Sequence, residues 1–312
     1  MENTDVLIIG GGASGLSVGG ALKHLAGISA VILDREGMVG ASWARRYDRL
    51  HLHTARALSH LAYYRMPSDW PRYPSRDQYV QYLQDYAAHF ELDIRHHTSV
   101  TGLEQQDSGW LVKTDKGDWR ARAVVIATGY NNVPYMPRWE GVTEYTGHLL
   151  HSYDYKNGRD FHGQRVLVVG CGNSGTEICV DLVEKGVAYV ANSIRKPPMT
   201  VPRDPLGLPV QYWGIPLSLM PVPIADALAG LITRLQLGNL ARYGFGPPSW
   251  RIFRDGRIPM IDVGYVRLLK QGDIHLYPDI ARFTADGVLF TDGRAEAFDA
   301  IIAATGYRTG LT

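Results

Sequence analysis

Two stretches of the chain share one pattern of hydrophobic residues followed by glycines. Asp5–Gly15 reads DVLIIGGGASG and Arg165–Gly175 reads RVLVVGCGNSG, and a run with helix-like spacing of apolar residues follows each. A short apolar run that ends at a GxGxxG turn and opens a helix is typical of a buried strand in a dinucleotide-binding unit. The pattern therefore predicts two such units, whose first glycines, Gly10 and Gly170, lie 160 residues apart.

A second pair of apolar segments supports this duplication. Val124–Tyr130 (VVIATGY) and Ile301–Tyr307 (IIAATGY) each follow a hairpin-like stretch. Both read as a small antiparallel β-meander that ends in a buried strand and a glycine turn. We therefore expect an α/β fold with two Rossmann-like three-layer domains, the second inserted in the first, and each carrying a β-meander.

Other elements are less regular. Ser75 with Gln78 forms a capping-box pattern that predicts a helix start, and apolar spacing predicts a helix over Ile224–Gln236. Residues 197–258 are rich in Pro, Gly and aromatic residues, so we expect a loop-rich insert with short helices that caps the approach of the substrate. The stretch Tyr145–Gly158 shows neither strand alternation nor helix spacing, and its pattern favours neither element.

Composition limits the kind of protein. The chain has 312 residues, of which 45% are hydrophobic and 20% charged, and a formal charge of +1. This balance is typical of a globular protein with a small-molecule partner and argues against nucleic acid. Prolines and charges interrupt the apolar segment Leu217–Leu240, which excludes an integral membrane span there. The two cysteines, Cys171 and Cys179, and an N-terminus without signal features indicate the cytoplasm, and a homodimer is compatible with this composition.

The glycine turns predict two phosphate sites. In a GxGxxG turn the glycines allow a tight bend, close approach of a pyrophosphate and close packing of helix on strand, and the helix N-terminus faces the phosphates. The ATG segments are expected to border the same sites. The candidate cofactor-binding residues in these turns are Gly10, Gly12, Ala13, Ser14, Gly15, Thr128, Gly129, Gly170, Gly172, Asn173, Ser174, Gly175, Thr305 and Gly306.

The end of the second strand in each unit indicates which dinucleotide binds. Asp34 follows Gly10 by 24 positions, where a carboxylate accepts hydrogen bonds from ribose hydroxyls, and Arg35 is its neighbour. Arg195 and Lys196 occupy the equivalent place in the second unit, and a guanidinium there suits a 2′-phosphate. We therefore predict NADPH in the second unit and FAD in the first. The alternative is that the two basic residues form a solvated strand end.

Several motifs resemble the flavin-containing monooxygenases (class B flavoprotein monooxygenases), most closely the YUCCA-type enzymes and related bacterial proteins. The family signature FxGxxxHxxx(Y/F) is matched with Tyr in place of Phe, and ExxxxxGGxW with Asp for Glu and Ala for the second Gly. The segments GCGNSGTEI, ATGYNNVPYMP and LQLGNLARYG also have counterparts, so the resemblance covers essentially the whole chain. The matching signature residues are Tyr145, Gly147, His151, Tyr155, Asp34, Gly40, Ala41 and Trp43.

The resemblance implies a domain plan and a reaction. Residues 1–144 would form the first part of the FAD-binding domain, 145–160 a linker with the signature, 161–298 the NADPH-binding domain with its insert, and 299–312 the return to the FAD domain. The family adds a further strand and helix to this return, whereas only RTGLT follows the last ATGY. NADPH would reduce FAD, O2 would add to it, and a C4a-(hydro)peroxyflavin would transfer one oxygen atom to a small organic substrate. Either an amine or sulfide, or a 2-oxo acid such as indole-3-pyruvate, fits this chemistry.

The resemblance also nominates two histidines as catalytic-site residues. His53 falls where many family members carry Asn beside the flavin ring, and a structural role in a strand is its alternative reading. His151 is expected to be a positioning residue near the nicotinamide nucleotide. Neither the His51, His53 and His60 group nor His148 with His151 has the carboxylate or thiolate support of a metal site, so we expect no metal.

Two other functions compete with oxygenation. A disulfide reductase would share the two dinucleotide units but needs a redox cysteine pair, which Cys171 and Cys179 do not resemble. A flavoprotein that does not oxygenate remains open, either an NADPH oxidase or reductase that makes only peroxide, or a truncated cofactor-binding protein.

Overall fold

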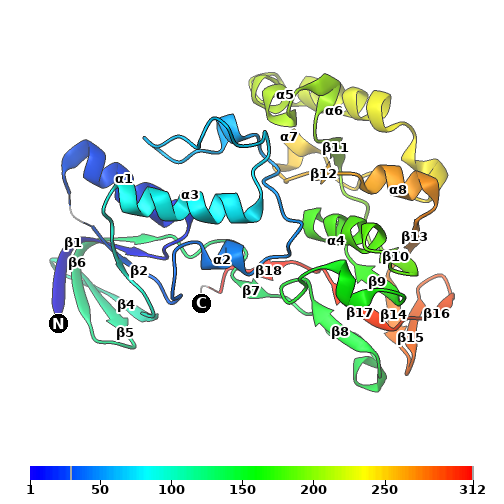
Figure 1. Cartoon of the computed structure of the whole chain (residues 1–312), viewed down its shortest axis with the longest axis horizontal. Helices are drawn as coiled ribbons and strands as arrows, with labels where there is room; N and C mark the ends of the chain where they lie inside the picture. The colour runs from blue at the N-terminus through cyan, green and yellow to red at the C-terminus, as the bar shows by residue number, and fades with distance from the viewer. Residues whose placement is uncertain (29, 311–312) are drawn as a thin grey trace. The chain divides into compact units, whose positions relative to one another are not determined.

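The chain folds into two compact units, each built on its own sheet (Figure 1). This computed structural model describes residues 1–28 and 30–310. Unit 1 contains Met1–Arg46, Ala55–Val133 and the residues from Tyr307, and unit 2 contains Tyr47–Thr54 and Pro134–Gly306. The predicted α/β fold with two Rossmann-like units is confirmed. An unexpected finding is that the short segment Tyr47–Thr54 belongs to unit 2.

Unit 1 is built on a six-stranded sheet in the order β3-β2-β1-β6-β5-β4. Strands β3, β2, β1 and β6 are parallel, and β6, β5 and β4 form the predicted antiparallel meander. The strand bounds are β1 (Glu2–Ile9), β2 (Ala30–Leu33), β3 (Asp93–Arg95), β4 (Val100–Gln106), β5 (Gly109–Thr114) and β6 (Trp119–Ile126).

Two long helices lie side by side on one face of this sheet, α1 (Ala13–Ala26) and α3 (Arg76–His89) (Figure 1). A Cβ at Gly20 of α1 would overlap the Tyr86 hydroxyl of α3, so glycine permits this close approach. The predicted capping box at the start of α3 is confirmed, because Ser75 Oγ accepts the Gln78 N–H and Gln78 Oε1 accepts the Ser75 N–H. Unit 1 also contains α2 (Ala41–Ala44) and η1 (Arg56–Leu58).

Unit 2 is built on a five-stranded parallel sheet in the order β13-β10-β9-β17-β8. Its edge strand β8 lies in the segment for which the sequence pattern favoured neither strand nor helix, and its backbone pairs with β17 about 150 residues later in sequence. The bounds are β8 (His148–His151), β9 (Arg165–Val169), β10 (Tyr189–Ser193), β13 (Ile274–Tyr277) and β17 (Ala300–Ala303). A meander of β14 (Ile280–Phe283), β15 (Gly287–Phe290) and β16 (Ala295–Ala297) precedes β17.

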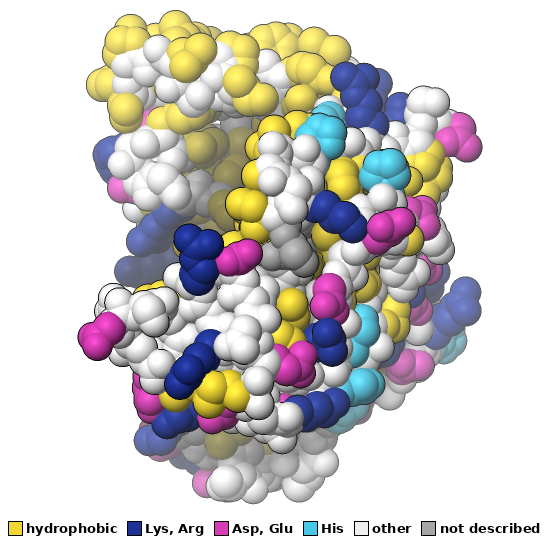
Figure 2. All heavy atoms as spheres, turned by 90° about the vertical axis from the view of Figure 1, so that its left-hand side faces the viewer, with side chains coloured by type: hydrophobic (Ala, Val, Ile, Leu, Met, Phe, Trp, Pro, Cys, Tyr) yellow, Lys and Arg dark blue, Asp and Glu magenta, His cyan; other side chains and the backbone are white. Residues whose placement is uncertain are grey.

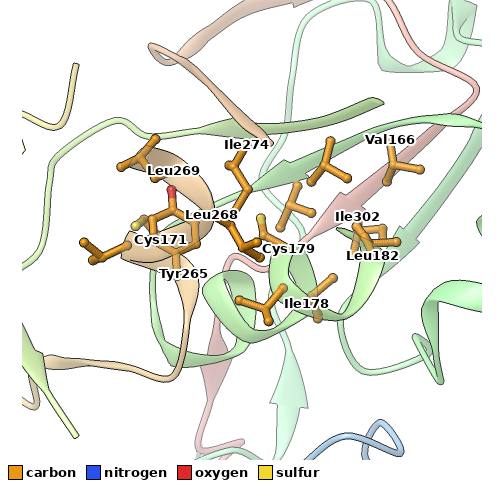
Figure 3. Close-up of a cluster of buried hydrophobic side chains, with 14 of the residues drawn as sticks. Val166, Cys171, Ile178, Cys179, Leu182, Tyr265, Leu268, Leu269, Ile274 and Ile302 are labelled. Atoms are coloured by element: carbon orange, nitrogen blue, oxygen red, sulfur yellow. The ribbon is translucent and has the colours of Figure 1, made fainter. Parts of the chain in front are cut away.

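Helices α4 (Asn173–Glu184) and α8 (Tyr265–Gln271) cover this sheet and enclose a hydrophobic core (Figure 3). Ile178 and Leu182 of α4 and Leu268 of α8 belong to one buried cluster with Val166 and Ile302 of the strands, and Leu182 lies beside Ile302. This packing fixes the start of α4, which follows the second glycine turn. Shorter elements are η2 (Val142–Glu144) and η3 (Gly158–Phe161), and β7 (Val133–Pro134) and β18 (Tyr307–Arg308) occur where the chain passes from one unit to the other.

The insert of unit 2 leaves and rejoins the domain through a parallel strand pair, β11 (Thr200–Pro202) and β12 (Met260–Asp262). Between them lie η4 (Pro205–Gly207), α5 (Val210–Leu217), α6 (Val222–Leu237), η5 (Leu240–Tyr243) and α7 (Ile252–Asp255). Helix α6 confirms the helix predicted over Ile224–Gln236. Apolar side chains gather on the surface of α5, α6 and the turn between them (Figure 2), with Leu219 of the turn 86% and Leu235 of α6 76% exposed. In residues 1–28 and 30–310, no helix is long and apolar enough to cross a bilayer.

Candidate functional site

The first glycine turn has the geometry of a phosphate cradle. Gly10 has a φ of +108°, and a Cβ there would lie 2.5 Å from the Ala127 carbonyl oxygen. A Cβ at Gly15 would collide with the Gly10 carbonyl oxygen. A Cβ at Gly12, in contrast, would meet no heavy atom within 4 Å among the described residues. The fold thus requires the first and third glycines, while the second leaves an open surface that a ligand can approach.

The second glycine turn repeats this geometry in unit 2. Gly170 has a φ of +111°, and a Cβ there would lie 2.5 Å from the Ala304 carbonyl oxygen. A Cβ at Gly175 would collide with the Gly170 carbonyl oxygen, and one at Gly172 would have open space around it within the described part of the chain. The same division of roles in both turns indicates that each unit provides a nucleotide cradle.

The helices that follow these turns begin without a side-chain cap. Gly12 and Gly172 are the N-cap residues of α1 and α4, and neither can bond the N–H groups of the first helical turn through a side chain. Helix α3 differs, since its own Ser75 satisfies such a group. Uncapped N–H groups and the positive end of the helix dipole favour an anion at each cradle.

The first-turn residues Ala13, Ser14 and Ser174 lie beside these open glycines, with Ser14 exposed. The Asn173 side chain also makes two hydrogen bonds within the protein. Its Oδ1 accepts the Ile261 N–H at 2.8 Å and its Nδ2 donates to the Pro259 carbonyl at 3.3 Å, so the side chain ties α4 to β12.

The strand ends carry the two residue types that distinguish the nucleotides. Asp34 follows β2, where its Oδ2 accepts the Gly11 N–H at 2.9 Å and its Oδ1 accepts the Glu36 N–H at 2.9 Å. These bonds fix the carboxylate at the edge of the first cradle. Arg195 and Lys196 follow β10 and are both exposed, so their cations are available to a phosphate. Arg35 is exposed as well and donates to Asn132 Oδ1 at 2.7 Å.

The two ATG turns border their cradles in the same way. After β6, the Ala127 N–H donates to the Ile9 carbonyl at 2.8 Å, and after β17 the Ala304 N–H donates to the Val169 carbonyl at 2.8 Å. Thr128 and Thr305 come next, followed by glycines with positive φ, +80° for Gly129 and +86° for Gly306. Each turn therefore lies against the first glycine of its own unit.

Comparisons with known proteins identify the family. Residues 7–205 match the family model described as pyridine nucleotide-disulphide oxidoreductase. Indole-3-pyruvate monooxygenase YUCCA1 of Oryza sativa subsp. japonica is 36% identical, over 98% of this chain and 77% of its own. Probable indole-3-pyruvate monooxygenase YUCCA3 of Arabidopsis thaliana is 34% identical, over 98% and 73%. The structure of the flavin-containing monooxygenase from Stenotrophomonas maltophilia has a TM-score of 0.75 and 28% identity, over 99% of this chain and 79% of its own.

The chain belongs to the flavin-containing monooxygenases. This confirms the resemblance seen in the sequence. The protein is an NADPH-dependent flavoprotein monooxygenase with FAD and NADPH as cofactors and O2 as co-substrate. The two glycine cradles, the Asp34 carboxylate and the exposed Arg195 and Lys196 are chemically suited to these cofactors.

The two cysteines of this flavin-containing monooxygenase are not a redox pair. Cys171 and Cys179 are both free and both lie in the core of unit 2 (Figure 3). Burial raises the pKa of the Cys171 thiol to about 12 and that of Cys179 well above its ordinary value. Thiolates, which disulfide exchange requires, are therefore disfavoured at both positions, and the disulfide-reductase alternative has no support from these residues.

Residues of the family signature bind the segment around β8 to other parts of unit 2. The Tyr145 hydroxyl donates to the Phe298 carbonyl at 2.8 Å, and a Cβ at Gly147 would overlap this same hydroxyl. The Tyr155 hydroxyl donates to Asp181 Oδ2 on α4 at 2.6 Å. Burial and the Asp181 carboxylate raise the pKa of the Tyr155 phenol, so it remains a proton-bearing donor. The signature residues therefore have structural partners within one unit.

His151, the signature histidine, is 4% exposed and uses both ring nitrogens. Its Nδ1 accepts the Tyr153 N–H at 3.0 Å, so the neutral ring carries its hydrogen on Nε2. That Nε2 lies 3.1 Å from the Gly306 carbonyl and donates to it. His151 therefore links the signature segment to the second ATG turn.

Replacement of His151 by alanine is expected to lower the free energy of unfolding by about 1–3 kcal/mol, because the part-buried Tyr153 N–H and Gly306 carbonyl lose their partner. Urea denaturation would measure the change. His148→Ala is the matched control on the same strand, since its side chain is exposed and should alter stability by less than about 1 kcal/mol. Equal effects of the two variants would contradict the role assigned to His151.

His53, the other predicted histidine, lies in the Tyr47–Thr54 segment with 19% of its side chain exposed. Its Nε2 is 3.1 Å from Glu177 Oε1, at an angle outside hydrogen-bond geometry, and its carbonyl accepts the Gln211 Nε2–H at 3.1 Å. Glu177 and Asp181 are functional candidates that the sequence patterns did not single out. The available signal was two carboxylates four residues apart on a mostly apolar predicted helix.

Gly40 and Trp43 lie in unit 1 at the short helix α2. Gly40 has a φ of +80° and caps α2, and the Trp43 ring packs edge-on against Tyr79 with 4.6 Å between ring centres. Their assignment to the FAD site remains a prediction. The described residues contain no cluster of three or more metal-ligating side chains.

Proposed function

We propose that this monooxygenase oxygenates the carbonyl carbon of a small 2-oxo acid of the indole-3-pyruvate type. The observation that supports this substrate class is 34–36% identity to plant indole-3-pyruvate monooxygenases over 98% of the chain. The apolar surface of α5 and α6 is compatible with an aromatic substrate that approaches along the insert.

The roles proposed for the residues follow from the cradle geometry. The open surface at Gly12 and the start of α1 binds the FAD pyrophosphate, and Asp34 binds a ribose of FAD. Gly172 and the start of α4 bind the NADPH pyrophosphate, while Arg195 and Lys196 bind its 2′-phosphate. FAD, when bound, accepts hydride from NADPH and activates O2. The further proposed cofactor contacts are Gly10, Ala13, Ser14, Gly15, Arg35, Gly40, Trp43, Thr128, Gly129, Gly170, Asn173, Ser174, Gly175, Thr305 and Gly306.

Two histidines are proposed to support the chemistry. His53 would place an imidazole beside the reacting atoms, where it holds or donates a proton. His151 would position the second ATG turn through Gly306. The protein must also exclude water, because activated oxygen is lost as peroxide in a wet site.

Product analysis tests the substrate class. The purified flavin-loaded protein is supplied with NADPH and, in parallel, indole-3-pyruvate, a tertiary amine and a thioether, and product, peroxide and NADPH consumption are measured. We expect indole-3-acetate in near-stoichiometric yield with NADPH and at least tenfold less product from the other two substrates. Oxygenation of only the amine or thioether would refute the carbonyl assignment, and peroxide alone would favour a non-oxygenating flavoprotein.

The location and assembly of the protein also remain proposals. The two free buried cysteines are compatible with a reducing compartment, which supports the cytoplasm. A homodimer remains a prediction that sedimentation velocity tests.

A further inference from the structure

Glu177 is a carboxylate buried inside unit 2. It lies on α4, five residues after the N-cap Gly172 of the nucleotide cradle, and is only 2% exposed. An ionised carboxylate in such a place is costly unless charges and hydrogen bonds compensate for lost water. The identity of its partners therefore indicates why the fold keeps a carboxylate there.

Among the described residues, the polar partners of the Glu177 side chain come from one short segment, Tyr47–Thr54. The Tyr47 hydroxyl donates to Oε2, His53 Nε2 lies 3.1 Å from Oε1, and Arg49 Nη1 lies 4.0 Å from Oε1. This segment groups with unit 2, although the residues before and after it belong to unit 1. Glu177 therefore provides the polar contacts that hold the Tyr47–Thr54 segment, which comes from the first half of the sequence, on unit 2.

Arg49 has a stronger partner than Glu177. Its Nε and Nη2 contact the two carboxylate oxygens of Glu184 at 3.0 and 3.2 Å. Burial lowers the pKa of the Arg49 guanidinium, but Glu184, with smaller contributions from Glu177 and Asp181, outweighs burial and raises it. Because Glu184 satisfies the guanidinium in this paired geometry, Tyr47 and His53 are the nearest partners of Glu177.

The contact with Glu177 bears on which ring nitrogen of His53 carries hydrogen. A nitrogen lone pair aimed at a carboxylate oxygen 3.1 Å away would be repelled, so the contact favours hydrogen on Nε2. The backbone of His53 is held separately by Gln211 of α5. Side chain and main chain of this residue are thus both fixed by unit 2.

We propose that Glu177 is a positioning residue that holds the Tyr47–Thr54 segment on α4 and fixes the His53 imidazole in its Nε2–H form. This rests on the proposed role of His53 in oxygenation. Since Glu177 is little more than one helical turn from the cradle, the same helix would carry both the NADPH phosphate site and the support for His53. Displacement of the imidazole would then divert NADPH consumption from product to peroxide.

Glu177→Gln tests the proposal, because glutamine has nearly the same shape but no charge. Three measurements are made on the flavin-loaded protein: amide hydrogen exchange of peptides covering residues 47–54, the ¹⁵N spectrum of labelled histidines with His53 assigned by His53→Gln, and the ratio of product to NADPH. We expect at least tenfold faster exchange in the segment, a changed balance between the two His53 nitrogens, and at least a threefold lower product ratio.

Glu184→Gln is the matched control, since Glu184 lies on the same helix but binds Arg49 in place of His53. It should leave the His53 ¹⁵N signals and the product ratio unchanged. Unaltered amide hydrogen exchange and unaltered ¹⁵N signals in Glu177→Gln would overturn the proposal. A lower melting temperature without a change in these two measurements would overturn it as well. Hydrogen exchange and the ¹⁵N spectrum can be measured without catalytic turnover. If the wild-type protein did not oxygenate any substrate, the proposed function would be refuted, but these two measurements would still decide the role of Glu177.

Discussion

Replacement of Gly172 by alanine is expected to leave the apo-protein nearly as stable as the wild type and to raise the Kd for NADPH by about 10- to 100-fold. The φ of −85° at Gly172 suits alanine, and a Cβ there meets no described heavy atom within 4 Å. The methyl group would instead occupy the surface that the pyrophosphate approaches, and each lost charge-assisted bond is worth about 1.5–3 kcal/mol. Flavin reduction in stopped flow gives the Kd, and thermal melting gives the stability.

The control for this experiment is Gly175→Ala in the same turn. Its Cβ would collide with the Gly170 carbonyl oxygen, so this variant should lose stability as well as NADPH binding. Flavin content should stay unchanged in Gly172→Ala, because Gly172 belongs to unit 2 and the glycine turn proposed to bind FAD belongs to unit 1. Unchanged NADPH affinity in Gly172→Ala would show that the nucleotide does not use this turn.

Arg195→Ala is expected to weaken NADPH binding by about 10- to 100-fold and to leave the Kd for NADH within about twofold of the wild type. The guanidinium is exposed at the end of β10, and NADH lacks the 2′-phosphate that it would pair with. Flavin reduction by each nucleotide, measured at fixed ionic strength, gives both constants.

Arg122→Ala provides a matched control, because Arg122 is an exposed arginine of unit 1 outside the proposed cofactor contacts and should not affect either nicotinamide nucleotide. Lys196→Ala should have a smaller effect than Arg195→Ala, since an ammonium cannot form a two-pronged contact. Equal loss of NADPH and NADH affinity in Arg195→Ala would mean that the arginine binds a part common to both nucleotides, and the assignment of the 2′-phosphate site would be wrong.

Local patterns were sufficient to predict much of this fold. Each glycine turn combines a buried strand, a bend and a helix start within about 11 residues, so its geometry depends on neighbours in sequence. The capping box at Ser75 is local in the same sense. Its reciprocal bonds were therefore predictable from two residue types three positions apart.

Features that depend on distant partners could not be predicted in this way. Strand β8 forms because its backbone pairs with β17, and His148–His151 alone has no strand alternation. The partners of Tyr155 and Tyr47 are carboxylates on α4, 26 and 130 residues away in sequence. A single sequence shows only that Glu177 and Asp181 lie on a mostly apolar predicted helix. The groups that donate hydrogen bonds to these two carboxylates become known only from the tertiary structure.

The position of Tyr47 has a consequence for how this enzyme can be divided. Its ring is 3% exposed within the core of unit 2, 6.3 Å from the ring of Tyr155, although the other buried residues of that core cluster come from positions after 134. A fragment that begins at Pro134 would contain the whole second sheet and still lack one aromatic ring of its own interior. The nucleotide unit is therefore not a transferable module, and recombination between relatives would need to carry the Tyr47–Thr54 segment along with it.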